Sequence, residues 1–284
     1  MAVAAQEVFR ADQRPAFYVN IESDEIVFLD GGHSAPLDTK LKIAESLRAH
    51  GYATRGGETP QITAAQRDLA ARLIDRASTF GPALGQINGL AQQAKPRLQC
   101  QMTEAQADSR KLADMLGLFV DAGYVKQSGT TLIFPDEASR FFVNGGWLEY
   151  HLLHVLRDLQ GTHAITDVAI NLQVTHPDGR TGNEIDVAFM HRNTLHIIEC
   201  KTANLAQPGV TQDGRATEAV YRLESLLKLG GLRTRGMILD YRGAFAASDA
   251  DRKRAQMARI EILSGGELKD VKGQLTRRWM AAAA

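Results

Sequence analysis

The chain has 284 residues, 44% of them hydrophobic and 23% charged, which is the composition of an ordinary globular protein of about two domains. Its apolar runs fall short of the ~20 residues that cross a membrane, and its first residues lack the basic and apolar regions of a secretory signal. We therefore expect neither an integral membrane protein nor a secreted one, but a cytoplasmic protein in which Cys100 and Cys200 are reduced thiols.

The net charge of zero is distributed unevenly along the chain. Residues 210–284 carry 14 Lys and Arg against 9 Asp and Glu, whereas residues 1–209 carry 19 against 24. This excess is small enough to arise by chance, and it is also typical of a surface that binds polyanions. Arg252 and Arg254 are candidate phosphate contacts in this part, although a solvated helix face is the simpler interpretation.

The first part of the chain predicts a hairpin followed by helices. Two apolar strands are expected at 16–21 and 25–30, and helices at 36–52 and 59–77, the second with Thr63 as its N-cap. Glycines at 81, 85 and 89 have helical spacing, which favours a closely packed helix over a phosphate-binding loop. Residues 103–136 then predict two helices and a short strand. This is the pattern of a winged-helix-like connector, with a plain linker as the alternative.

The remaining residues predict a mixed α/β domain that begins near Phe142. A strongly amphipathic helix at 144–159 is followed by a meander of three strands and then by alternating helices and strands. The strands are expected at 165–176, 184–190, 195–202, 235–241 and 260–263, and the later helices at 214–231 and 247–260. This order predicts a central sheet with helices packed against it.

The segment "HIIECKT" at 196–202 ends an apolar strand with two charged side chains on one face, Glu199 and Lys201. The preceding hairpin places Met190 opposite Leu195, and hence Asp186 opposite Glu199. Glu149 can reach the same end of the sheet from the amphipathic helix. Mg²⁺ and Mn²⁺ take such carboxylates as ligands, together with substrate phosphates. The alternative is a strand-edge salt bridge between Lys201 and the acids.

The segments "FFVNGGWLEYHLLHVL", "GNEIDV" and "LHIIECKT" resemble the restriction-endonuclease-like PD-(D/E)xK superfamily, and within it the nuclease domain of CARF-plus-endonuclease effectors of type III CRISPR systems. The resemblance covers about residues 96–284. It implies that Asp186, Glu199 and the Cys200 carbonyl bind Mg²⁺ or Mn²⁺ and that Lys201 orients the attacking water. Glu149 is implied as an added acid. The flanks of these segments match the family at Asn183, Glu184 and Thr202.

The same resemblance implies an organisation and partners. We expect a partial Rossmann-like CARF sensor at 1–95, a winged-helix-like connector at 96–142 and a restriction-endonuclease-like nuclease domain at 143–284, acting as a homodimer on DNA or RNA. Effectors of this family fire on cyclic oligoadenylates such as cyclic tetra-adenylate. A Gly-Gly-Thr-Lys run typical of their activator loop does not occur in this sequence. We therefore expect the first half of the sensor to be missing and activator binding to be weak or absent, and we assign no activator-binding residues.

The function predicted from the sequence is thus a metal-dependent endonuclease of type III CRISPR antiviral defence. The alternatives are a non-catalytic or deregulated nucleic-acid-binding remnant and a stand-alone restriction-type DNA endonuclease. A zinc site, a serine hydrolase and an NTPase have little or no support, because the sequence contains no HExxH, no G-x-S-x-G and no Walker A segment.

Overall fold

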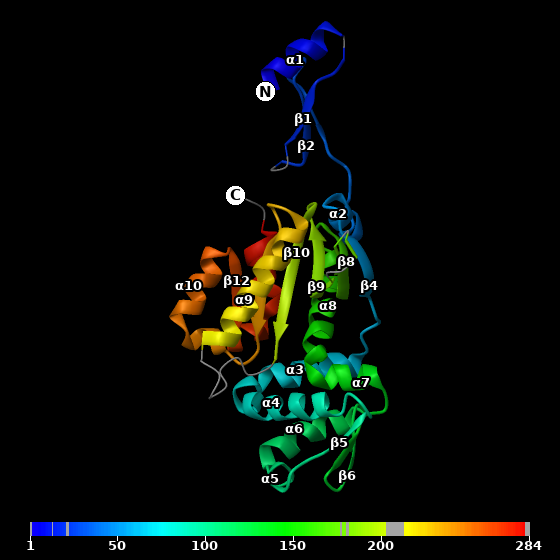
Figure 1. Cartoon of the computed structure of the whole chain (residues 1–284), viewed down its shortest axis with the longest axis vertical. Helices are drawn as coiled ribbons and strands as arrows, with labels where there is room; N and C mark the ends of the chain where they lie inside the picture. Colours follow the sequence, from blue (N-terminus) through cyan, green and yellow to red (C-terminus); the bar gives the residue numbers. More distant parts are fainter. Residues whose placement is uncertain are drawn as a thin grey trace. The chain divides into compact units, whose positions relative to one another are not determined.

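The computed structural model describes residues 2–12, 14–20, 23–176, 178–179, 182–202 and 213–281 (Figure 1). The chain divides into two compact units, Met1–Leu41 and Lys42–Ala284. Among the helices in the described ranges, none combines the length and the apolar character needed to cross a membrane.

The first unit contains one helix and an antiparallel sheet of three short strands in the order β1-β2-β3. Phe17 pairs with Phe28 and Asn20 with Glu25, so the hairpin predicted from the two apolar runs is confirmed. The third strand was not predicted, because a segment of three residues that ends in a proline carries little strand signal. The elements of this unit are α1 (Ala2–Ala11), β1 (Phe17–Asn20), β2 (Glu25–Phe28) and β3 (Ser34–Pro36).

The second unit is built around a six-stranded sheet in the order β12-β11-β10-β9-β8-β4. β8, β9 and β10 form the predicted antiparallel meander. β10, β11 and β12 run parallel to one another, so the sheet is mixed, as predicted. Its strands are β4 (Ala53–Glu58), β8 (Ile165–Thr175), β9 (Gly182–His191), β10 (Thr194–Lys201), β11 (Arg235–Asp240) and β12 (Ile260–Ser264).

Helices cover both faces of this sheet. α8 packs on β8 and β9, α9 packs on β10 and β11, and α10 packs on β12. Because strand side chains alternate, Ile198, Met237 and Leu239 join one core with the buried side of α8, whereas Glu199 and Lys201 point to the opposite face, on the side of α9. The helices of the second unit are α2 (Ile43–Ala49), α3 (Ala64–Asp75), α4 (Ala77–Gln93), α5 (Glu104–Ala107), α6 (Arg110–Asp121), α7 (Glu137–Phe141), α8 (Trp147–Gln160), α9 (Asp213–Leu227), α10 (Asp249–Met257) and α11 (Val271–Leu275).

The helical layer at the carboxyl end of β10 comes from residues that precede β8, β9 and β10 in the sequence. α3 begins after Thr63, whose hydroxyl accepts a hydrogen bond from the Gln66 N–H as the predicted N-cap. α4 and α6 pack together beside a small sheet in the order β5-β7-β6. Its strands are β5 (Gln99–Gln101), β6 (Lys126–Ser128) and β7 (Thr131–Ile133). The expected helical pair and strand are therefore present, with two further short strands.

The predicted domain boundaries at 95 and 142 stay predictions. β4 lies before the predicted connector in the sequence, yet it forms one edge of the six-stranded sheet. Ala53 pairs with Thr175 and Glu58 pairs with Ile170. The first unit ends at Leu41, so the sheet of the second unit includes residues from the predicted sensor region.

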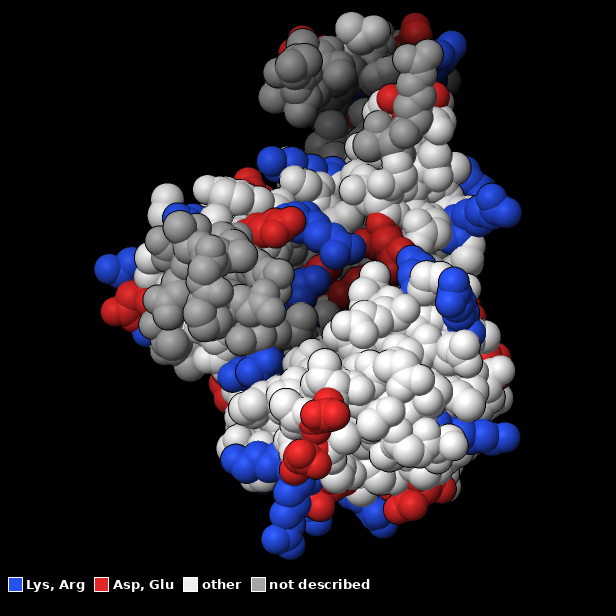
Figure 2. Space-filling view, turned by 60° about the horizontal axis from the view of Figure 1, so that its bottom comes forward, with Lys and Arg blue, Asp and Glu red and all other residues white. Residues whose placement is uncertain are grey.

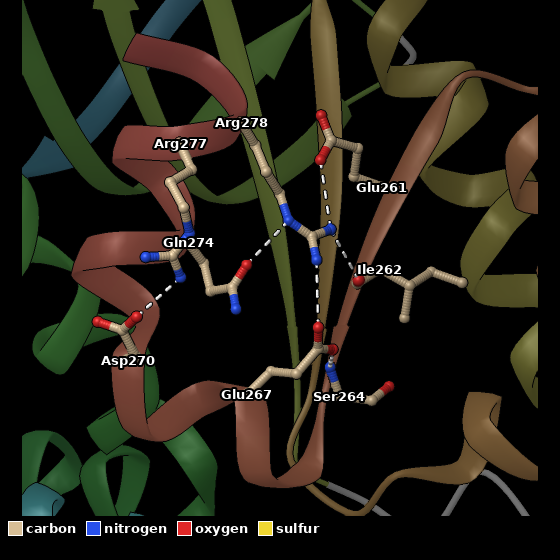
Figure 3. A network of polar contacts seen from close by, with 8 residues as sticks. All are labelled: Glu261, Ile262, Ser264, Glu267, Asp270, Gln274, Arg277 and Arg278. Atoms are coloured by element: carbon tan, nitrogen blue, oxygen red, sulfur yellow. Dashed lines mark hydrogen bonds and ion pairs between the residues drawn. The ribbon is translucent and has the colours of Figure 1, made fainter. Parts of the chain in front are cut away.

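A network of polar contacts connects the C-terminal residues to β12. Arg278 is half-buried and donates to Glu261, to Glu267, to Gln274 and to the Ile262 carbonyl (Figure 3). This network holds the neighbouring Trp279 against the His196 ring, with 4.8 Å between the ring centroids.

Candidate active site

The site begins where the β9–β10 hairpin opens. Leu195 pairs with Met190, as predicted, and the ladder continues to the pair of Ile198 and Val187. Beyond that pair the Cys200 N–H donates to the Asp186 Oδ2 at 2.8 Å, so a side-chain carboxylate takes the place of a ladder acceptor. The hairpin therefore brings Asp186 beside Glu199 at the carboxyl end of β10.

Glu199 is fully buried and forms ion pairs with two basic side chains. Lys201 Nζ lies 2.5 Å from Glu199 Oε1, and Arg222 Nη1 lies 2.9 Å from the same oxygen. Arg222 Nη2 is also 3.9 Å from Asp186 Oδ1 and donates to the Glu184 carbonyl. The expected convergence of Asp186, Glu199 and Lys201 is thus found, with an arginine from α9 added to it.

Glu149 enters the site from the first turn of α8. Its position depends on the kink at Asn144 and Gly145 that precedes this helix. Gly145 has φ +110°, and a Cβ there would lie 2.3 Å from the Thr202 hydroxyl oxygen. The glycine therefore allows the start of α8 to approach the end of β10, and Glu149 becomes 8% exposed beside the other acids.

Burial and mutual repulsion disfavour the charged forms of these acids. Burial and the neighbouring Glu199 raise the pKa of Asp186. Lys201, the Cys200 N–H and Arg222 oppose this increase, and the resulting pKa is about 7. Burial also raises the pKa of Glu149 well above its usual range, and Asp186, Glu184 and Glu199 raise it further. Three acids therefore compete for negative charge in one small volume, and Lys201 and Arg222 compensate for only part of it.

The donor set fits a hard divalent cation. Glu149 Oε2 and Glu199 Oε2 are buried and have no hydrogen-bond partner among the described residues. In the same residues, no group of three or more His, Cys, Asp or Glu side chains is arranged to enclose a metal ion. Mg²⁺ commonly takes only one or two protein carboxylates and completes its shell with water and phosphate oxygens. These residues can therefore supply part of such a shell.

The other predicted site residues lie at varied positions. Glu184 is on β9 and accepts from Gln173 and, through its carbonyl, from Arg222, while Asn183 pairs with Val174 near the amino end of the same strand. Thr202 is buried and accepts a hydrogen bond from Asn88 of α4.

The two α10 arginines proposed as phosphate contacts are engaged on the protein surface. Arg252 pairs with Asp249, and Arg254 pairs with Asp251 and Thr217. Their substrate-binding role stays a prediction.

Arg222 was not predicted from the sequence as a residue of this site. A helix of 15 residues with several charged positions does not reveal which of them points at the sheet, because this depends on the rotation of α9 about its axis. The helix was expected to follow the strand that carries Glu199. The signal available in the sequence was a basic residue directly before the buried Leu223, next to the apolar stripe of that helix.

One face of the molecule is hollowed (Figure 2). Figure 2 shows acidic side chains lying in a depression with Lys and Arg side chains around it. A recess with an acidic floor and a basic rim suits a polyanion held over bound cations.

A mixed sheet flanked by helices, with acids and a lysine at the carboxyl end of one strand, defines an α/β domain of the nuclease type. The chain belongs to the Card1-like endonuclease family, because residues 136–283 match the model described as "Card1-like, endonuclease domain". No curated protein matches the sequence.

Three solved structures are similar to the chain. Protein VC1899 from Vibrio cholerae is 31% identical, with a TM-score of 0.83, over 97% of this chain and 71% of that one. Can2 from Sulfobacillus thermosulfidooxidans, solved with cyclic tetra-adenylate, is 24% identical, with a TM-score of 0.73, over 98% and 71%. A type III CRISPR defence DNA nuclease activated by cyclic oligoadenylate is 19% identical, with a TM-score of 0.41, over 80% and 28%.

Proposed function

We propose that this protein is a metal-dependent nuclease that hydrolyses phosphodiester bonds of DNA or RNA in type III CRISPR defence. The observation that carries the proposal is the cluster of Asp186, Glu199 and Lys201 at the end of β10, within a domain of the Card1-like endonuclease family. The resemblance of the strand and helix segments to type III CRISPR effectors supports the biological setting.

Each residue of the cluster has a chemical task in this proposal. Asp186 and Glu199, together with the Cys200 carbonyl, would hold Mg²⁺ or Mn²⁺. Such an ion lowers the pKa of a bound water and neutralises charge on the phosphoryl oxygens. Lys201, held by Glu199, would orient the attacking water. Glu149 would add negative charge for a second ion or accept a proton.

Arg222 would keep the two central carboxylates in place. One guanidinium reaches both Glu199 and Asp186, so it fixes the relative positions of their oxygens before substrate arrives. Such preorganisation is worth more in a buried site than in water, because the groups need not rearrange during the reaction.

The test of this function is direct. Purified protein is incubated with labelled single- and double-stranded DNA and RNA in Mn²⁺, in Mg²⁺ and in EDTA. We expect internal cleavage with either metal and none in EDTA. A protein that binds nucleic acid and cleaves no substrate with either metal would favour the non-catalytic remnant.

We further propose that a cyclic oligoadenylate controls this activity. The similarity in fold to Can2, which was solved with cyclic tetra-adenylate, extends over 98% of this chain and supports the proposal. The expectation stated from the sequence is weak or absent binding of this activator. Isothermal titration with cyclic tetra-adenylate separates the two, since saturable binding supports control and no heat of binding supports a deregulated nuclease.

The last part of the proposal is a homodimer. The first unit exposes a set of large apolar side chains, and burial of such a set between two copies would remove it from water. These side chains are Val8, Phe9, Phe17, Tyr18 and Val19. Light scattering coupled to gel filtration measures the mass, and a mass of one chain would contradict the dimer.

A further inference from the structure

We propose that Arg242 binds a backbone phosphate of the nucleic-acid substrate next to the scissile one. This inference rests on the proposed nuclease function and adds a substrate contact to the same site. Arg242 was not among the residues predicted to bind substrate.

The position of Arg242 is set by the sheet. β11 runs parallel to β10, with Asp240 paired with Lys201, and the Tyr241 N–H donates to the Lys201 carbonyl at 3.0 Å. Arg242 therefore leaves the sheet beside Lys201, at the edge where the acidic cluster lies.

The backbone at Arg242 is held firmly. The Asp240 carboxylate is fully buried and accepts from the N–H groups of Arg242, Gly243 and Phe245, at 3.2, 3.1 and 2.9 Å. The Ser264 hydroxyl donates to the same carboxylate. Because this turn is fixed, only the side chain of Arg242 has freedom to adjust to a ligand.

The side chain of Arg242 extends across α4. A Cβ at Gly85 would lie 2.8 Å from Arg242 Nη1, and one at Gly81 would lie 3.7 Å from Arg242 Nε. Asn88, one turn further along the same face, donates to the Thr202 hydroxyl at 3.1 Å. Since three helical residues rise only about 4.5 Å, the guanidinium lies within roughly one nucleotide of the residue that follows Lys201.

Within the described part of the chain, Arg242 forms no ion pair. Arg254 and Arg278 are also half-buried, and each pairs with an acidic side chain. Arg242 is half-buried as well, yet no carboxylate lies within ion-pair distance of its guanidinium among the described residues. Burial lowers the pKa of this guanidinium, and the nearby Asp240 opposes that effect. A guanidinium in this state gains from a phosphate, which it can bind with two parallel hydrogen bonds.

The glycines provide a matched set of variants. At Gly85 an alanine methyl group would displace the guanidinium, although alanine favours a helix by about 1 kcal/mol over glycine. Gly89 lies on the same helix and a Cβ there has no atom within 4 Å, so Gly89→Ala makes the same chemical change without touching Arg242.

The experiment measures the binding of labelled DNA and RNA oligonucleotides by fluorescence anisotropy in EDTA, where nothing is cut, with and without cyclic tetra-adenylate, across a series of salt concentrations. We expect Arg242→Gln to weaken binding about 3–10-fold at low salt and to reduce the salt slope by about one unit. Gly85→Ala should have the same effect with an unchanged or higher melting temperature, and Gly89→Ala should bind like the wild type.

The outcomes separate this proposal from the nuclease function. Wild-type affinity and salt slope in Arg242→Gln would overturn the role of Arg242, even if the protein cleaves. Binding without cleavage in Mn²⁺ would overturn the nuclease function, while the effect of Arg242→Gln on binding would still decide its own role. A wild-type protein that binds neither DNA nor RNA in any of these conditions would overturn both.

Discussion

Arg222 Nη1 lies 2.9 Å from Glu199 Oε1, and the same guanidinium reaches Asp186. This arginine therefore neutralises the two carboxylates that we propose as metal ligands, and a divalent cation bound to them would experience its positive charge.

The first prediction follows from this repulsion. At about pH 8, Arg222→Gln should bind Mn²⁺ about tenfold more tightly in isothermal titration, since a divalent ion and a unit charge about 6 Å apart repel by roughly 1.4 kcal/mol even at the dielectric constant of water. Arg222→Lys keeps the charge and should stay close to the wild type. Weaker Mn²⁺ binding by Arg222→Gln would show that holding the two carboxylates in place outweighs this repulsion.

Lys201 gives a prediction about catalysis. Lys201→Ala should abolish cleavage and leave nucleic-acid affinity nearly intact, because Lys201 is paired with Glu199 and its proposed role is to orient the attacking water. Lys228→Ala removes an exposed lysine that pairs with Glu224 on the surface and should cleave at the wild-type rate. Wild-type cleavage by Lys201→Ala would contradict its role in orienting the water.

Glu149 should show opposite effects on stability and function. Glu149→Gln removes a buried acid whose charged form is disfavoured, so in EDTA the melting temperature should rise by about 2–4 °C, the shift that 1 kcal/mol produces in a domain of this size. Cleavage in Mn²⁺ should fall in the same variant. A lower melting temperature with unchanged cleavage would identify Glu149 as a purely structural residue.

His196 predicts how stability depends on pH. Burial lowers its pKa to about 3, so the folded protein excludes a proton that the unfolded chain takes up below its ordinary pKa of about 6.5. Stability should therefore fall as the pH decreases through 6.5, by about 2 kcal/mol between about pH 7.5 and pH 5 for this histidine. His196→Phe, which can keep the stack on Phe189, should lose that part of the dependence.

Urea denaturation followed by tryptophan fluorescence measures this effect. Both tryptophans, Trp147 and Trp279, are buried in the second unit, so the signal reports that unit. An equal pH dependence in wild type and His196→Phe would show that other groups cause it.

The division of the chain gives a prediction about fragments. Residues 42–284 should fold as a unit, whereas residues 96–284 lack β4, α3 and α4 and would leave the edge of β8 and the buried face of α8 uncovered. Circular dichroism melting compares the two fragments. A cooperative transition of 96–284 at the temperature of 42–284 would show that the earlier segment adds no stability.

Local patterns were sufficient to predict most of this fold. The turn after Met190 set the hairpin register, and Thr63 marked a helix start, because both depend on neighbours in the sequence. The side chains of Asp186, Glu199 and Lys201 followed from that register. Two features could not be predicted in this way. Arg222 depends on how α9 is rotated on the sheet, and β4 depends on a pairing with residues more than a hundred positions later.

The edge strand β4 also has a consequence for synthesis of the chain. Ala53 leaves the ribosome 122 residues before its partner Thr175, which at about 5–20 residues per second is a delay of roughly 6–25 seconds. During this time the strand has open hydrogen-bonding edges on both sides. Its sequence, Ala-Thr-Arg-Gly-Gly-Glu, contains two glycines, two charges and no large apolar side chain, so it has little tendency to pair with other nascent chains while it waits.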